Sequence, residues 1–171
     1  MSIVGGEERR WTAGRGMTTG DNIVQLVTFR IGTEEFGIEI LQVQEIIRMR
    51  EVTVVPRAPD FVEGMINLRG HIIPVIDLRV RLQLEAAPRT RSTRIMVVRM
   101  GTKTVGMIVD AVSEVLRVPS DIIELPPPLV SGIDTRFING IGRLEQKILI
   151  LLDVEKILED QEMEDLTRMD E

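Results

Sequence analysis

The chain of 171 residues lacks cysteine, has a single histidine and contains only 3 % aromatic residues. The absence of cysteine excludes disulfides, thiol catalysis and cysteine-ligated metal sites. The low aromatic content removes the stacking platforms on which single-stranded nucleic acids bind. The formal net charge of −6 also argues against a general affinity for the phosphate backbone. We therefore expect no nucleic-acid partner.

Long apolar runs are also missing, and none reaches the length of a membrane span. The stretch 1–20 carries glycines and charges of both signs, which differs from a secretory signal and is typical of a disordered tail. Whether Met1 or Met17 is the native start stays open. The expected location is the cytoplasm, without direct insertion into a membrane.

Aliphatic residues dominate what is present, because apolar residues make up 43 % of the chain. Alternating apolar positions predict a strand over 23–31, and shorter strands are expected at 36–38 and 52–55. The segment 41–47 has apolar residues at helical spacing, so a helical turn competes with a strand there. The composition and the strand pattern favour an all-β protein.

The stretch 63–79 is the organising element of the sequence, because two apolar runs fold back on each other around Gly70. Arg69 lies at this bend, where a long cation can reach solvent or a partner. Asp77 closes the second run and is predicted to cap a helical turn over 78–82.

The two halves of the chain resemble each other at a constant offset of 69 residues, as Arg30, Gly37 and Glu45 illustrate with Arg99, Gly106 and Glu114. Later, Asp77 and Asp153 each follow an apolar run. A duplicated unit of short strands is the simplest interpretation, and two small barrels packed together would bury what one unit could not bury alone. The polar break at 86–92 predicts a first barrel over about 21–85 and a second over about 93–153, within one domain of 21–158. A terminal helix and tail are expected over 154–171.

Side chains suited to catalysis are scarce. His71 lies beside the predicted turn, where a solvated surface role is far more common than a catalytic one. Asp77 and Asp153 are better explained as helix caps than as a carboxylate pair. We expect no enzyme activity, no metal site and no cofactor. A small-ligand or enzymatic barrel domain remains the alternative, and it would need a pocket with converging polar groups.

Four stretches in order resemble the CheW family of chemotaxis coupling proteins, and together they cover most of the chain after residue 20. Any one of them is weakly specific, whereas all four at the family's spacing are strongly specific. The stretches are Glu34–Ile46, Asn67–Gly70 with Ile73–Arg79, Val105–Leu116 and Leu149–Leu158.

The resemblance implies two tandem five-stranded SH3-like barrels and a non-enzymatic adaptor that joins chemoreceptors to the histidine kinase CheA. Receptor tips are expected to bind between the barrels, and the regulatory domain of the kinase on the surface of the first barrel, with individual kinase contacts unknown. A paralogous coupler in a pathway for twitching motility or gene regulation is the alternative. The positions that correspond to the family's receptor-binding residues are Arg69, Val43, Glu45, Gly64, Gly106 and Val115.

Overall fold

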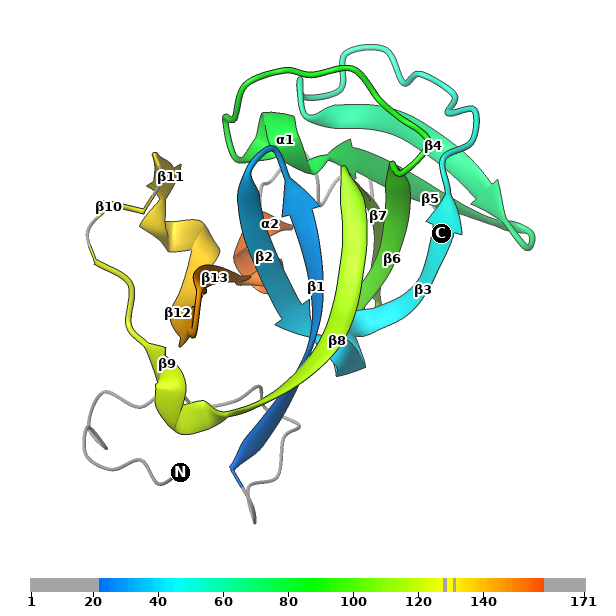
Figure 1. Ribbon diagram of the computed structural model, residues 1–171. Coiled ribbons are helices and arrows are strands. Elements are labelled where there is room, and N and C mark those ends of the chain that lie inside the picture. The colour runs from blue at the N-terminus through cyan, green and yellow to red at the C-terminus, as the bar shows by residue number, and fades with distance from the viewer. Residues whose placement is uncertain (1–21, 128, 131, 159–171) are drawn as a thin grey trace.

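The computed structural model describes residues 22–127, 129–130 and 132–158, and the expected tail of 1–20 and most of the expected terminal helix lie outside them. One five-stranded sheet has the strand order β3-β6-β7-β5-β4 and comes entirely from the middle of the chain. We call it the central barrel (Figure 1). Its elements are β3 (Val43–Arg48), β4 (Val62–Leu68), β5 (His71–Asp77), α1 (Leu78–Arg81), β6 (Arg94–Met100) and β7 (Lys103–Val109).

The other main sheet has six strands in the order β8-β1-β2-β13-β12-β9 and combines both ends of the described chain. We call it the terminal barrel; in Figure 1 its blue hairpin β1–β2 lies beside yellow-green β8. Its elements are β1 (Ile23–Ile31), β2 (Glu34–Glu39), β8 (Ala111–Pro119), η3 (Ser120–Ile122), β9 (Ile123–Glu124), η4 (Thr135–Phe137), β12 (Ile138–Leu144), β13 (Lys147–Leu152) and α2 (Val154–Ile157). The short turn η2 (Ile40–Gln42) leads from β2 into β3, and β10 (Leu129–Val130) pairs with β11 (Ile133–Asp134).

The sequence repeat is visible in the structure, because β1-β2-β3 corresponds to β6-β7-β8 and β4-β5-α1 corresponds to β12-β13-α2. Each hairpin, however, pairs with strands of the other repeat. Strand β1 pairs with β8 and β2 pairs in parallel with β13, while β6 pairs with β3 and β7 pairs in parallel with β5. The two barrels therefore arise by a reciprocal exchange of the hairpins that open the repeats.

This exchange places the division between the barrels elsewhere than at the expected break. Residues 43–109 build the central barrel, so the polar stretch 86–92 is a surface loop between α1 and β6 of one barrel. The expected barrels of 21–85 and 93–153 follow the repeats, whereas the sheets draw on both. A polar stretch in the sequence indicates a loop but does not indicate which strands pair with each other. Strand pairing between the two repeats therefore could not be detected from composition.

Local expectations were met at most elements. The segment 41–47 contains both competing structures, since η2 is followed directly by β3. Asp77 caps α1 by accepting a hydrogen bond from the backbone N–H of Arg79 at 3.0 Å, and Asp153 caps α2 by accepting one from the N–H of Lys156 at 3.2 Å. The strand expected at 52–55 is reduced to a single bridge between Thr53 and Met65.

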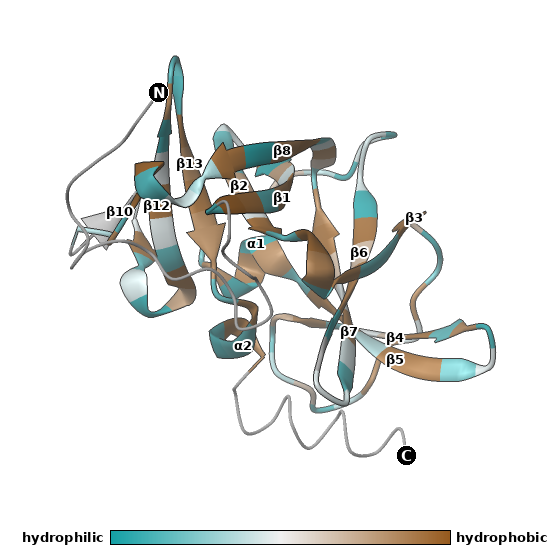
Figure 2. Cartoon of the chain, turned by 90° about the horizontal axis from the view of Figure 1, so that it is seen from below, coloured by the Kyte–Doolittle hydropathy of each residue, from teal (hydrophilic) through white to brown (hydrophobic). Residues whose placement is uncertain are grey.

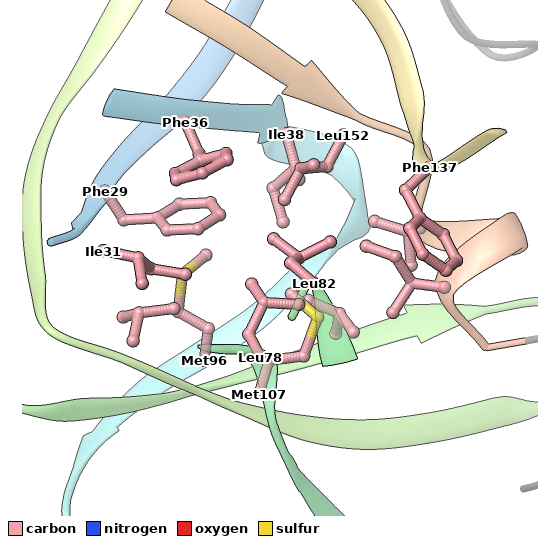
Figure 3. Packing of buried hydrophobic residues seen from close by; sticks show 14 of the residues in the cluster. Phe29, Ile31, Phe36, Ile38, Leu78, Leu82, Met96, Met107, Phe137 and Leu152 are labelled. Atoms are coloured by element: carbon pink, nitrogen blue, oxygen red, sulfur yellow. The ribbon is translucent and has the colours of Figure 1, made fainter. Parts of the chain in front are cut away.

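The largest hydrophobic cluster lies between the two sheets (Figure 3). Phe29 and Phe36 of the terminal barrel stack with ring centroids 5.8 Å apart, and they face Met96 and Met107 of the central barrel. Each barrel also has a smaller cluster of its own. Since fully burying one such side chain contributes about 1.5–3 kcal/mol, most of the apolar stabilisation requires both barrels to be in contact.

Candidate partner-binding surface

The hairpin β4–β5 turns through Arg69 and Gly70, whose φ angles are 53° and 87°. Two central residues with positive φ are typical of a type I′ turn, whose twist matches that of the flanking strands. The Asn67 side-chain oxygen accepts a hydrogen bond from the Gly70 N–H at 2.9 Å. Glycine suits the second position, whereas an arginine held in the left-handed region is unusual. The turn thus projects the Arg69 side chain from the tip of the hairpin.

The Arg69 guanidinium binds a carboxylate on another strand. Its Nη1 donates to Glu45 Oε2 at 2.7 Å, and the two side chains are 69 % and 22 % exposed. The hydrogen bond from Arg69 holds the pKa of Glu45 below its usual value, and the same bond raises the pKa of Arg69. Strands β3 and β4 are the two edges of the sheet. The ion pair therefore spans the seam at which the central barrel closes.

Backbone hydrogen bonds close the same seam below the ion pair. The N–H groups of Thr53 and Met65 donate to each other's carbonyl oxygens at 2.9 and 2.8 Å. Gly64 lies directly beside this bridge with a φ of 151°, and a Cβ at that position would be 2.1 Å from the Thr53 carbonyl oxygen. Gly64 is buried, so the structure gives it a packing role in the closure of the barrel.

Gly106 is also buried, within β7 of the central barrel. A Cβ there would lie 2.7 Å from Cγ2 of Ile95 and 3.4 Å from Cγ2 of Val75. The residue therefore permits close packing of the barrel interior, and its own atoms do not form part of the exposed surface.

Val43 and Val115 lie on different barrels. Val43 opens β3 opposite Val98 and is half-buried against the shared core. Val115 is on β8 opposite Val27, another residue of the shared core, and is 52 % exposed. Directly opposed residues of paired strands point to the same face of a sheet. Val115 thus lies on the face of the terminal barrel that turns toward the central barrel, at its edge.

Ile46 is a candidate that the sequence reasoning missed. It lies on β3 opposite Met96 of the shared core, yet it is 40 % exposed. Its position is therefore equivalent to that of Val115, and the repeat offset of 69 relates the two residues. That offset could have identified Ile46, because a duplicated edge position carries an apolar residue in both copies.

The polar groups considered for catalysis have simpler roles. His71 is exposed beside the turn, and Asp77 and Asp153 cap α1 and α2. Within the described ranges, no three carboxylate or imidazole groups lie close enough to hold a metal ion. No helix among these same residues is long and apolar enough to cross a membrane. What the site offers is an exposed cation, its paired carboxylate and apolar edge positions, which are groups for binding.

A protein-family model for the CheW-like domain matches residues 25–162. The chain belongs to the CheW family. Chemotaxis protein CheW of Klebsiella aerogenes is 39 % identical over 148 residues, which cover 86 % of this chain and 87 % of that one. Chemotaxis protein CheW of Treponema pallidum is 33 % identical and covers 90 % and 92 %.

A solved CheW structure shares the fold. The crystal structure of the scaffolding protein TtCheW from Thermoanaerobacter tengcongensis matches with a TM-score of 0.76 and 37 % identity, over 81 % of this chain and 94 % of that chain. The expected all-β architecture of two small SH3-like barrels is therefore confirmed. The family membership inferred from four sequence stretches is confirmed as well.

Proposed function

We propose that this CheW-family chain is a non-enzymatic adaptor that couples the cytoplasmic tips of chemoreceptors to the histidine kinase CheA. Its place in the cell would be the cytoplasmic side of membrane-associated receptor arrays. The names of its relatives support a chemotaxis role, and its likeness to the scaffolding protein TtCheW supports a scaffold.

The single observation that carries the receptor assignment is the exposed Glu45–Arg69 pair. A strained type I′ turn holds Arg69 outward, and Glu45 fixes one end of its guanidinium. A pre-oriented guanidinium can donate further hydrogen bonds to a carboxylate or to backbone carbonyls, while its stem covers apolar surface. The free energy needed to order this side chain on binding is correspondingly reduced.

We assign contact roles to Arg69, Glu45, Val43 and Val115, and Ile46 joins them as the repeat counterpart of Val115. Two further positions, Gly64 and Gly106, support the same surface through the backbone and the barrel interior. The kinase's regulatory domain is proposed to bind elsewhere on the strands of 21–85, with its contact residues unassigned.

The test is reconstitution of the purified chain with CheA and a receptor signalling domain. We expect the chain to bring the two proteins into one sedimenting complex, and Arg69→Ala to prevent this. Glu145→Ala is the matched control, because Glu145 is the repeat counterpart of Arg69 on the other barrel. Equal co-sedimentation of receptor and kinase with and without the chain would contradict the proposal. Phosphate transfer from ATP by the purified chain alone would contradict its non-enzymatic part.

A coupling protein of another chemosensory pathway is the second candidate. Protein FrzA of Myxococcus xanthus, a relative with a different name, is 32 % identical over 77 % of this chain and 82 % of its own length. Capture of receptors with the chain as bait would decide between the pathways. A receptor of a motility system other than the flagellum would favour this second candidate.

A further inference from the structure

A basic pocket lies on the central barrel where β3 ends and β6 begins. Its volume is about 550 Å³. Ligand pockets are usually lined by apolar groups, whereas half of the residues here are arginines. The lining residues are Arg48, Met49, Thr90, Arg91, Thr93 and Arg94.

The positive charge of this pocket is not neutralised within the described part of the chain. Among the described residues, no ion pair includes Arg48, Arg91 or Arg94. The carboxylates beside the loop are bound elsewhere, since Arg89 reaches Glu63 at 3.0 Å and Asp77 at 3.7 Å. These three arginines thus have no carboxylate partner in the residues that the structure describes, although the net charge of the chain is −6.

Hydrogen bonds hold the loop that forms one wall of the pocket. The Thr90 N–H donates to the Thr93 hydroxyl oxygen at 2.9 Å, and the Ser92 N–H donates to the Thr90 hydroxyl oxygen at 3.1 Å. Nη1 of Arg94 donates to the carbonyl oxygens of Arg91 and Thr93. Arg91 is thus presented by an organised loop, while Arg48 and Arg94 are held on the ends of β3 and β6.

We propose that this pocket binds an acidic peptide segment of a partner protein. Arginine forks match carboxylates in geometry as well as in charge. A single small anion would contact only part of so large a pocket, and Met49 adds an apolar contact that suits a peptide side chain or stem. The site is separate from the Glu45–Arg69 pair and does not depend on it.

The repeat provides a matched control for this site. Arg117 on β8 is the counterpart of Arg48 at the offset of 69 and is exposed on the terminal barrel. The residues equivalent to Arg91 and Arg94 are Asn22 and Gln25, so two of the three pocket arginines have uncharged counterparts on the terminal barrel. Arg99, at the opposite end of β6, is also exposed and lies outside the pocket.

The experiment is titration of the full chain with N-acetylated hexaglutamate amide, followed by backbone amide NMR. We expect shifts centred on Thr90 and Thr93, and binding that weakens as salt is added. Arg48→Ala/Arg91→Ala should weaken binding roughly fivefold or more, while Arg99→Ala/Arg117→Ala, with the same loss of charge, should leave it unchanged. Equal weakening by both double variants would overturn the proposal, because it would indicate general attraction between charges.

Two further arms separate the peptide from other anions. Inorganic phosphate that saturates the same amides and displaces hexaglutamate at equal concentration would overturn the proposal in favour of a site for small oxyanions. The chain's own acidic stretch is tested with a full-length variant carrying Glu159→Gln, Asp160→Asn, Glu162→Gln and Glu164→Gln. Unchanged probe binding by this variant supports an external partner, and tighter binding would identify the chain's own stretch as the occupant.

Discussion

The two barrels are built from the same succession of strands, yet the Glu45–Arg69 ion pair of the central barrel has no equivalent at the matching positions of the terminal barrel. Glu45 and Arg69 correspond to Glu114 and Glu145 of the terminal barrel, at offsets of 69 and 76. Two carboxylates cannot form the pair, and Glu114 approaches Lys147 at 3.9 Å. Figure 2 shows a hydrophilic tip on the β12–β13 hairpin too, where the turn residue is Glu145 in place of Arg69. Duplication has preserved the fold, whereas the charge at this turn position is reversed between the two hairpins.

The short helices that end the two repeats differ in a similar way. In α1, Arg81 lies over the rings of Phe61 and Phe137 at 4.3 and 5.0 Å, and its Nε donates to the Ile157 carbonyl oxygen at 3.1 Å. This arginine joins the central barrel to the terminal barrel. The corresponding position of α2 is Ile157, a buried apolar residue. The contact between the barrels is therefore asymmetric although the strands are duplicated.

The largest difference in stability between the two barrels is expected when the seam of the central barrel is disrupted. Gly64→Ala places a Cβ where the Thr53 carbonyl oxygen lies within 2.1 Å, and the backbone must move to accept it. We expect the free energy of unfolding to fall by about 4 kcal/mol or more, measured by urea denaturation. Gly142→Ala on the terminal barrel is the control, since its nearest contact would be an ordinary 3.8 Å. Similar losses in both variants would contradict the assigned role of Gly64.

Removing the exposed cation should separate binding from stability. We expect Arg69→Ala to weaken receptor binding roughly thirtyfold, with an unchanged melting temperature because the side chain is exposed. Arg69→Lys should restore only part of the affinity, because an ammonium group lacks the planar fork. Receptor affinity and thermal melting of the three proteins check this. A large drop in the melting temperature of Arg69→Ala would instead make the pair a structural closure of the seam.

Two equivalent glycines allow the interiors of the two barrels to be compared directly, with a smaller expected effect on stability. Gly106 and Gly37 are related by the offset of 69, but an added Cβ would lie 2.7 Å from Ile95 in the first case and 3.2 Å from a Leu151 methyl carbon in the second. We expect Gly106→Ala to cost about 1–3 kcal/mol of unfolding free energy and Gly37→Ala less than about 1 kcal/mol, because the leucine end can shift. A larger loss of unfolding free energy for Gly37→Ala than for Gly106→Ala would contradict this prediction, because it would show that these distances do not determine how well each barrel interior accepts a methyl group.

The smallest expected effect is the acid titration of the ion pair. The pKa of Glu45 is lowered by its hydrogen bond to Arg69. The contribution of the pair is therefore present above the pKa of Glu45 in the unfolded chain and is lost as the pH falls through its folded value. Carboxyl carbon NMR should show the Glu45 pKa rising in Arg69→Ala. An identical titration in wild type and variant would mean that the pair does not persist in solution.

Much of the fold could be predicted from the sequence because its signals are local. Alternating apolar residues, a glycine at a reversal and an aspartate before a short helix indicated the strand 23–31, the hairpin around Gly70 and the cap at Asp77. The repeat was also detectable. The exchange of hairpins between repeats was not, because two equivalent hairpins carry the same pattern whichever neighbours they pair with.

The site was predictable only in part for a related reason. Glu45 and Arg69 were both candidates, but their contact depends on closure of the barrel, which brings together two strands at opposite edges of a sheet. Gly64 and Gly106 became candidates through the family resemblance, and the structure gives both of them a packing role. Ile46 was missed because two adjacent apolar residues, Ile46 and Ile47, do not indicate which of them faces solvent.

The exchanged hairpin also sets the order in which the protein can fold while it is being synthesised. The central barrel is a continuous stretch of chain and is complete once residue 109 has emerged. The hairpin β1–β2 emerges first, but its partners β8 and β13 are complete only at Pro119 and Leu152. At roughly 5–20 residues per second, β2 waits on the order of 10 s for β13. Strand β2, one of the earliest in the chain, is therefore among the last to be paired on both sides, and the interval between its synthesis and its pairing is when its open edge is most exposed to chaperones and to aggregation.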